Sequence, residues 1–124
     1  MSYDPIRTYE VQGQMCPLLS AQASHTAGTN KSLITAITDK KIRVMGAKIQ
    51  SAAAQGTYSF KSASAGTVLS PAFSAPASTL PPEDWPIQPQ GGPGYIETNS
   101  GEGLFVDVGT NTVNFLIFYI AYKP

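Results

Sequence analysis

The chain has 124 residues, and its 8 basic and 8 acidic side chains give a formal net charge of zero. This length fits one domain with a core of its own. Charged residues make up 13% of the chain, about half of the usual ~25%. The balanced charge supplies no basic face for nucleic-acid phosphates. We therefore expect a single domain that does not bind nucleic acid.

No apolar run approaches the ~20 residues of a membrane helix, so no membrane contact is expected. The first ten residues lack the basic and apolar segments of a secretory signal, so we expect no export by that route. The single cysteine, Cys16, excludes an intrachain disulfide and is predicted to be a small buried apolar residue.

Residues 1–28 differ from the rest of the chain and are predicted to form an N-terminal arm. Residues 3–11 alternate as a strand would, whereas residues 12–28 are mixed, with one proline and many small side chains. We expect the arm to lie along another surface.

The predicted domain spans residues 29–124. Prolines and glycines recur at short intervals and no stretch holds a helical period, which is typical of an all-β domain of short strands. Strands are expected at residues 32–38, 41–51, 57–62 and 68–75. In the third of these, Tyr58 and Phe60 alternate with polar residues, and Pro71 assigns the fourth to a sheet edge.

Residues 79–94 contain five prolines and three glycines, so they form neither a helix nor a central strand. We expect a long, stiff connection, with Trp85 and Ile87 as anchors.

The last third of the chain predicts two further strands, at residues 104–108 and 113–122. The second strand is apolar on both alternating faces. One face carries Val113, Phe115, Ile117, Tyr119 and Ala121, and the other, after Asn114, carries Leu116, Phe118, Ile120 and Tyr122. Because a strand with one wet face alternates apolar and polar residues, this strand needs cover on both sides. We expect one face to meet the core and the other to meet another protein. Which face lies inward stays open.

The elements together predict an all-β fold. Seven or eight short strands, one long crossover and a terminal central strand suit a jelly-roll or Greek-key β-sandwich.

Residue types that catalyse reactions are scarce. His25 is the only histidine, so with one cysteine a four-ligand zinc site of the usual kind is excluded, and His25 is interpreted as a polar loop residue. The carboxylate pairs Glu97/Glu102 and Glu83/Asp84 lie in turn-like segments without an apolar pocket to separate their pKa values. We therefore predict no catalytic, cofactor-binding or metal site, and no enzyme.

Trp85 and Tyr95 have two interpretations. With Gln88, Gln90 and Asn99 nearby, they suit a platform on which a sugar ring stacks. Alternatively, the two rings pin the proline-rich crossover to the sandwich.

Four segments carry a family resemblance: D-K-K-I-R-V-M-G (39–46), Q-G-T-Y-S-F-K-S (55–62), G-Y-I-E-T-N-S-G-E-G-L-F-V-D-V (94–108) and the closing Y-I-A-Y. Residues 29–122 resemble small jelly-roll proteins of tailed-bacteriophage virions, namely capsid decoration (cement) proteins and related head or tail appendage domains. The crossover at 79–94 is heavier in proline than that pattern, and the N-terminal arm has no match in it.

The resemblance implies a non-enzymatic structural protein without a cofactor. Such a protein is made in the host cytoplasm, binds the outer face of the head as a homotrimer and stabilises contacts between major capsid proteins. We expect capsid contact at Tyr3, Ile6, Arg7 and Tyr9, and a subunit interface at Phe118, Ile120 and Tyr122. The alternative is a glycan-binding adhesion domain of a head fibre or tail appendage, with contacts at Trp85 and Tyr95.

Overall fold

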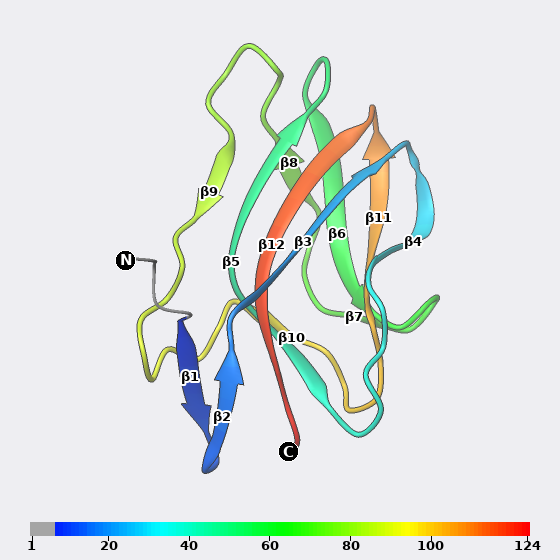
Figure 1. Ribbon diagram of the computed structural model, residues 1–124. Helices are drawn as coiled ribbons and strands as arrows, with labels where there is room; N and C mark the ends of the chain where they lie inside the picture. Colours follow the sequence, from blue (N-terminus) through cyan, green and yellow to red (C-terminus); the bar gives the residue numbers. More distant parts are fainter. Residues whose placement is uncertain (1–6) are drawn as a thin grey trace.

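In a computed structural model of the chain, which describes residues 7–124, two packed antiparallel sheets and a small hairpin make up the fold (Figure 1). The described residues form twelve strands and no helix. The predicted all-β sandwich is confirmed.

The first sheet, called here the β12 sheet, contains the two longest strands. Its order is β10–β5–β12–β3, and β9 pairs with the free edge of β5. The bounds are β3 (Leu19–His25), β5 (Lys41–Ser51), β9 (Glu83–Trp85), β10 (Ile96–Glu97) and β12 (Val113–Tyr122). The predicted bounds of β5 and β12 match the structure.

The second sheet, the β11 sheet, has the order β4–β11–β6–β7, with β8 also paired to β6. Its strands are β4 (Gly28–Ile34), β6 (Gly56–Ser62), β7 (Thr67–Val68), β8 (Phe73–Ala75) and β11 (Leu104–Thr110). β7 and β8 together replace the single edge strand predicted at residues 68–75, and both lie at the edge of β6, as Pro71 indicated.

The core lies between the two sheets. Tyr58 and Phe60 alternate inward from β6, as predicted, and are fully buried. They pack against apolar residues of the facing β12 sheet, among them Val44, Ile49, Val113, Phe115 and Ile117. One face of β12 therefore meets the core, as expected for a strand that is apolar on both faces.

A hairpin covers part of the other face of β12. Strands β1 (Thr8–Val11) and β2 (Gln14–Pro17) are joined at Gln12 and Gly13, whose φ angles of 51° and 78° suit a tight two-residue turn. The hairpin and the outer face of the β12 sheet enclose a second apolar cluster, called here the outer cluster: Tyr9, Cys16, Met45, Ile120 and Tyr122. The prediction that Cys16 is buried is confirmed.

A bulge in β5 supplies one member of this cluster. Phe118 of β12 pairs with Gly46, whereas the next residue, Tyr119, pairs with Val44, so Met45 has no partner in the register. Val44 and Ala47 consequently point into the core, while Met45 points into the outer cluster.

The predicted arm needs correction. Residues 19–25 form β3, which pairs along β12 from Tyr119 to Val113, and the hairpin of residues 8–17 packs against the same sheet. The physical reason is that β12 has a second edge to hydrogen-bond and a second apolar face to cover, and the N-terminal segment does both. The described part of the arm is therefore built into the sandwich.

The first predicted strand of the domain is displaced. Residues 32–38 were expected to be extended, but β4 covers Gly28–Ile34 and pairs with β11. Asn30 has a φ of 57° and its backbone N–H donates to the Asp107 carboxylate over 2.8 Å, which fixes an irregular pairing at this earlier point.

Candidate functional site

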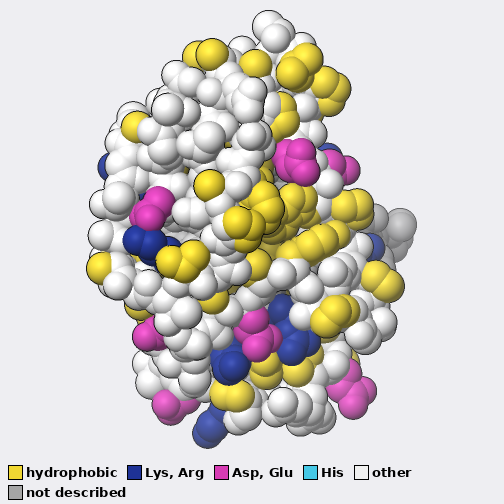
Figure 2. Space-filling model, turned by 180° about the vertical axis from the view of Figure 1, so that it is seen from behind, with side chains coloured by type: hydrophobic (Ala, Val, Ile, Leu, Met, Phe, Trp, Pro, Cys, Tyr) yellow, Lys and Arg dark blue, Asp and Glu magenta, His cyan; other side chains and the backbone are white. Residues whose placement is uncertain are grey.

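A groove opens at the edge of the sandwich, where β8 of one sheet approaches β9 and β10 of the other. It has a volume of about 470 Å³, and we call it the aromatic groove. Figure 2 shows hydrophobic side chains gathered across this face, with acidic side chains at the upper rim. The groove is lined by Tyr58, Phe73, Ser74, Glu83, Trp85, Tyr95 and Ile96.

Trp85 connects this groove to the core. Its ring centroid lies 5.7 Å from that of Phe60 and 5.9 Å from that of Phe73, both in edge-to-face geometry. The Tyr95 ring lies 5.2 Å from that of Trp85, tilted by 37°. The Tyr95 hydroxyl donates to the Pro86 carbonyl over 2.6 Å, so a ring that remains 39% exposed is held in place.

This geometry fits both interpretations of the pair. Trp85 lies in the crossover and packs against the core, and Tyr95, directly after the crossover, bonds back to Pro86, so the two residues fix the crossover to the sandwich. The exposed ring of Tyr95 still lies beside an open groove.

The amides expected beside this platform have other partners. Gln88 accepts a hydrogen bond from the Gly94 backbone N–H over 2.7 Å, and Gln90 bonds to β1 at Thr8 and Glu10. Asn99 donates to Glu102 over 3.0 Å. The three side chains therefore hold the fold together and do not line the aromatic groove.

The hairpin is anchored by polar contacts around its apolar side chains. The Tyr9 hydroxyl donates to the Gln88 carbonyl over 2.6 Å. Gln14 forms two hydrogen bonds with the backbone of Lys123, one of them from the Lys123 N–H over 2.8 Å. Both the crossover and the C-terminal end of the chain thus hold the hairpin.

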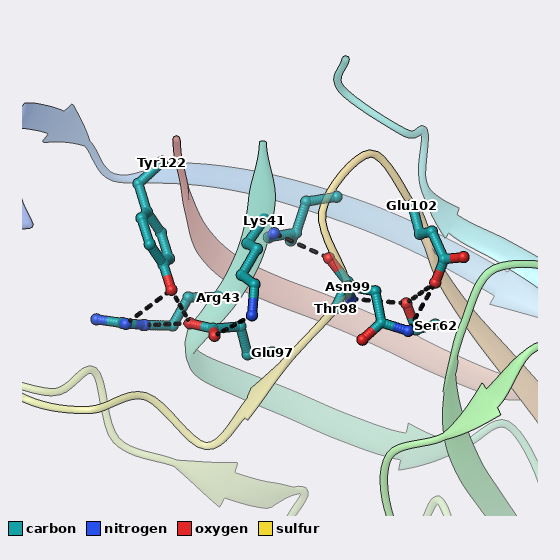
Figure 3. A network of polar contacts seen from close by, with 9 residues as sticks. Lys41, Arg43, Ser62, Glu97, Thr98, Asn99, Glu102 and Tyr122 are labelled. Atoms are coloured by element: carbon teal, nitrogen blue, oxygen red, sulfur yellow. Dashed lines mark hydrogen bonds and ion pairs between the residues drawn. The ribbon is translucent and has the colours of Figure 1, made fainter. Parts of the chain in front are cut away.

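A cluster of polar side chains surrounds Glu97, at the same end of the β12 sheet (Figure 3). Its carboxylate accepts hydrogen bonds from Arg43 Nε over 2.8 Å and from the Tyr122 hydroxyl over 2.7 Å, and pairs with Lys41 over 3.4 Å. The Arg43 guanidinium also lies 4.7 Å from the centroid of the Tyr122 ring. We call these residues the Glu97 cluster.

The pKa of Glu97 reports the strength of these contacts. Burial opposes ionisation, but the hydrogen bonds from Tyr122 and Arg43 and the nearby positive charges outweigh it. The pKa of Glu97 therefore lies below its ordinary value. A carboxylate stabilised in this way serves structure, because it fixes β10 to β5.

The two carboxylate pairs considered from the sequence, Glu97/Glu102 and Glu83/Asp84, have different surroundings in the structure. The neighbour expected for Glu97, Glu102, has partners of its own: it accepts hydrogen bonds from Ser62 over 2.7 Å and from Asn99, and the pKa of Glu102 is lowered by them (Figure 3). Glu83 and Asp84 are adjacent in β9, where strand alternation directs them to opposite faces.

A second hollow lies on the outer face of the β12 sheet, beyond the end that the hairpin covers. It has a volume of about 530 Å³, and we call it the outer-face hollow. Its lining includes the polar residues Gln22, Ser24, Lys48, Gln50 and Asn114 and the apolar residue Leu116.

Three expected contact residues are buried by the chain itself, which corrects their assignment. Tyr9, expected to contact the capsid, is 2% exposed, and Ile120 and Tyr122, expected at a subunit interface, are 0% and 4% exposed. The hairpin occupies the surface where a partner was expected. Phe118 is half-buried and Arg7 is exposed, while Tyr3 and Ile6 lie outside the described residues.

Residues 7–124 form neither a cluster of metal ligands nor a membrane-spanning helix. They contain no group of three or more His, Cys, Asp or Glu side chains that could hold a metal ion. His25 hydrogen-bonds the Ser32 carbonyl over 2.7 Å. Nor does the described part of the chain form a helix long and apolar enough to cross a membrane.

Neither family models, curated proteins nor solved structures give a match to this chain.

Proposed function

We propose that this chain is a structural virion protein, a decoration (cement) protein that binds major capsid proteins on the outer face of a bacteriophage head. The observation that carries the proposal is the aromatic surface at the edge of the sandwich. Phe73, Trp85 and Tyr95 gather around the aromatic groove on a chain whose core is already complete. Contiguous apolar surface of this kind is typical of sites that bind another protein.

The resemblance of residues 29–122 to phage decoration proteins gives this surface its proposed partner. A cement protein needs no catalytic residue. It binds the assembled shell and not the dispersed subunits, and so stabilises the shell by mass action. A homotrimer on a symmetry axis adds avidity, because three weak contacts form together.

The structure changes which residues we propose for these contacts. Ile120 and Tyr122 are covered, so the subunit interface is assigned to the open end of β12 at Phe118. Besides the aromatic groove, a second capsid contact is assigned to residues 3–7, which precede the hairpin, because the hairpin itself is packed against the sheet.

Mass measurement of the purified protein and co-sedimentation with empty heads test the proposal. Deletion of residues 2–6 should weaken co-sedimentation strongly and leave the melting temperature unchanged, because β1 begins at Thr8. Full binding by the shortened chain would contradict the assignment of the contact segment. A monomeric protein that does not bind shells would contradict the proposal as a whole.

A matched pair of substitutions tests the subunit interface. Phe118→Ser should shift the trimer towards monomer, whereas Val68→Ser should not, because Val68 is an exposed apolar residue on the other sheet. Equal dissociation of both variants would remove Phe118 from the interface.

A second candidate function, a glycan-binding adhesion domain, is favoured by the exposed ring of Tyr95 beside Trp85. Tyr95→Ala is the cleaner variant for a glycan array, because Trp85→Ala also removes core contacts with Phe60. A blank array for the intact protein would count against this function.

A further inference from the structure

The aromatic groove contains a buried hydroxyl without a partner. Tyr58 is 1% exposed, and its hydroxyl makes no hydrogen bond to residues 7–124. In that part of the chain no polar side-chain atom is both sealed from solvent and unpaired. Because the hydroxyl is not sealed and Tyr58 lines the groove, we infer that the hydroxyl opens onto the groove. The Tyr58 hydroxyl is therefore available to hydrogen-bond a ligand in the groove.

The groove also contains a carboxylate without a counter-ion. Glu83 takes part in none of the ion pairs that the described residues form. Glu83 and Tyr58 both line this groove. Burial raises the pKa of Tyr58, and the negative charge of Glu83 raises it further. Two unused polar groups thus face the same space.

The alternation of β9 places this carboxylate beside an aromatic ring. Glu83 and Trp85 are two residues apart, and both line the groove. Asp84, between them, lies opposite Lys48 in the register of β9 and β5 and does not line the groove. The groove therefore offers one negative charge together with the rings of Trp85, Tyr95 and Phe73.

The rings, the carboxylate and the hydroxyl of the groove all present negative potential to a ligand. Aromatic faces carry negative potential, carboxylates only accept hydrogen bonds, and a tyrosine hydroxyl also accepts them. No Lys or Arg of the described chain lines the groove. The ligand that complements all three groups is a cation with a flat, hydrogen-bonding head.

The same chain already binds such a group elsewhere. In the Glu97 cluster, the guanidinium of Arg43 lies over the Tyr122 ring, donates to the Glu97 carboxylate over 2.8 Å and donates to the Tyr122 hydroxyl over 3.2 Å (Figure 3). The aromatic groove has these three partners and lacks the arginine.

We propose that the aromatic groove binds the guanidinium group of an arginine side chain presented by a partner protein. The guanidinium stacks on the exposed ring of Tyr95, beside Trp85, and its N–H groups donate to the Glu83 carboxylate and the Tyr58 hydroxyl. The identity of the partner as a capsid protein rests on the proposed function. The preference of the groove for a guanidinium group does not depend on it.

The only tryptophan of the chain is Trp85, so intrinsic tryptophan fluorescence reports directly on this groove. The protein is titrated with N-acetyl-arginine methylamide and, separately, with the uncharged isostere N-acetyl-citrulline methylamide. We expect a saturable change for the arginine compound only. Glu83→Gln should weaken its binding about fivefold, the loss expected for one exposed charge contact. Asp84→Asn, the matched control, should leave binding unchanged.

Several outcomes would overturn the inference. They are equal responses to arginine and citrulline, equal affinity for the Glu83→Gln variant with its melting temperature intact, or a saturable response to monosaccharides alone. The last of these would support the glycan-binding candidate. The titration contains no capsid, so its failure is separable from a failure of shell binding. If both assays succeed, Glu83→Gln should also lower co-sedimentation with heads.

Discussion

The two ends of the outer face of β12 are alike in sequence and different in structure. At one end, Ile120 and Tyr122 are buried beneath the hairpin. At the other, Leu116 and Phe118 are only half-buried, and Leu116 lines the outer-face hollow. A strand that is apolar on both faces therefore requires cover, but its pattern does not say whether the same chain or another one provides it.

The two ends of this face also differ in their polar contacts. At the covered end, the Tyr9 hydroxyl and the Gln14 side chain bond to backbone groups of distant segments, and the Glu97 cluster borders the same cluster of apolar side chains. At the open end, the neighbours of Leu116 in the adjacent strands are Gln22 and Lys48, whose long side chains flank it on both sides.

Removal of the hairpin should have the largest effect, because it makes the covered end of β12 as open as the other end. Deletion of residues 2–18 uncovers Met45, Ile120 and Tyr122, so the chain should bind a hydrophobic dye and aggregate at temperatures where the intact protein is stable. Light scattering and dye fluorescence measure this. The deletion of residues 2–6 is the control, and aggregation of both chains to the same degree would contradict the assigned role of the hairpin.

Truncation of one apolar side chain at each end should lower the free energy of unfolding by different amounts. Ile120→Ala should lower the free energy of unfolding by about 2–5 kcal/mol, because it leaves a cavity in the outer cluster. Leu116→Ala should cost less than about 1 kcal/mol, because its side chain is already partly in water. Urea unfolding measures both values. Equal losses would mean that the hairpin does not seal the covered end.

The polar anchor of the hairpin should contribute less. Tyr9→Phe keeps the ring in the outer cluster but removes the hydrogen bond to the Gln88 carbonyl, which should cost about 1 kcal/mol. Thermal unfolding measures the change, with Tyr119→Phe as a control. A loss as large as that of Ile120→Ala would show that the hairpin is held by this hydrogen bond more than by burial.

The Glu97 cluster should give the smallest effect and a dependence on pH. Because the pKa of Glu97 is lower in the folded than in the unfolded chain, its ionised form stabilises the fold above its unfolded pKa of about 4.3. This contribution is lost as the pH falls through the folded pKa. With solvent screening it is below about 1 kcal/mol. Glu97→Gln should therefore destabilise the fold at neutral pH and reduce the loss of stability between about pH 5 and the folded pKa, measured by urea unfolding across the pH range. An unchanged dependence of stability on pH would contradict this role of Glu97.

Much of the fold could be predicted because its longest strands have unambiguous patterns. β12 is rich in β-branched and aromatic residues, and β5 carries Ile42, Val44 and Ile49 among its eleven residues; both strands were located to the residue. The alternation of Tyr58 and Phe60 identified β6. β3 was missed because Ala21 and Ala23 are its only side chains that pack against the core, and alanine gives little alternation to detect.

Tertiary pairing decided what the sequence could not show. The bulge that turns Met45 outward and the docking of the hairpin both depend on how segments meet in the folded chain. Trp85 and Tyr95 were recognised as rings near one another in the chain. Tyr58 and Glu83 come from β6 and β9, so their presence in the same groove is visible only once the sheets are packed.

The position of Cys16 makes the hairpin's motion measurable. The thiol is enclosed in the outer cluster, and burial raises its pKa, partly opposed by the charges of Lys40 and Arg43. A thiol reagent can therefore reach it only when β1 and β2 lift from the sheet. As the sole cysteine of the chain, Cys16 reacts at a rate that reports how often the hairpin detaches, and any partner that immobilises the hairpin would slow its alkylation.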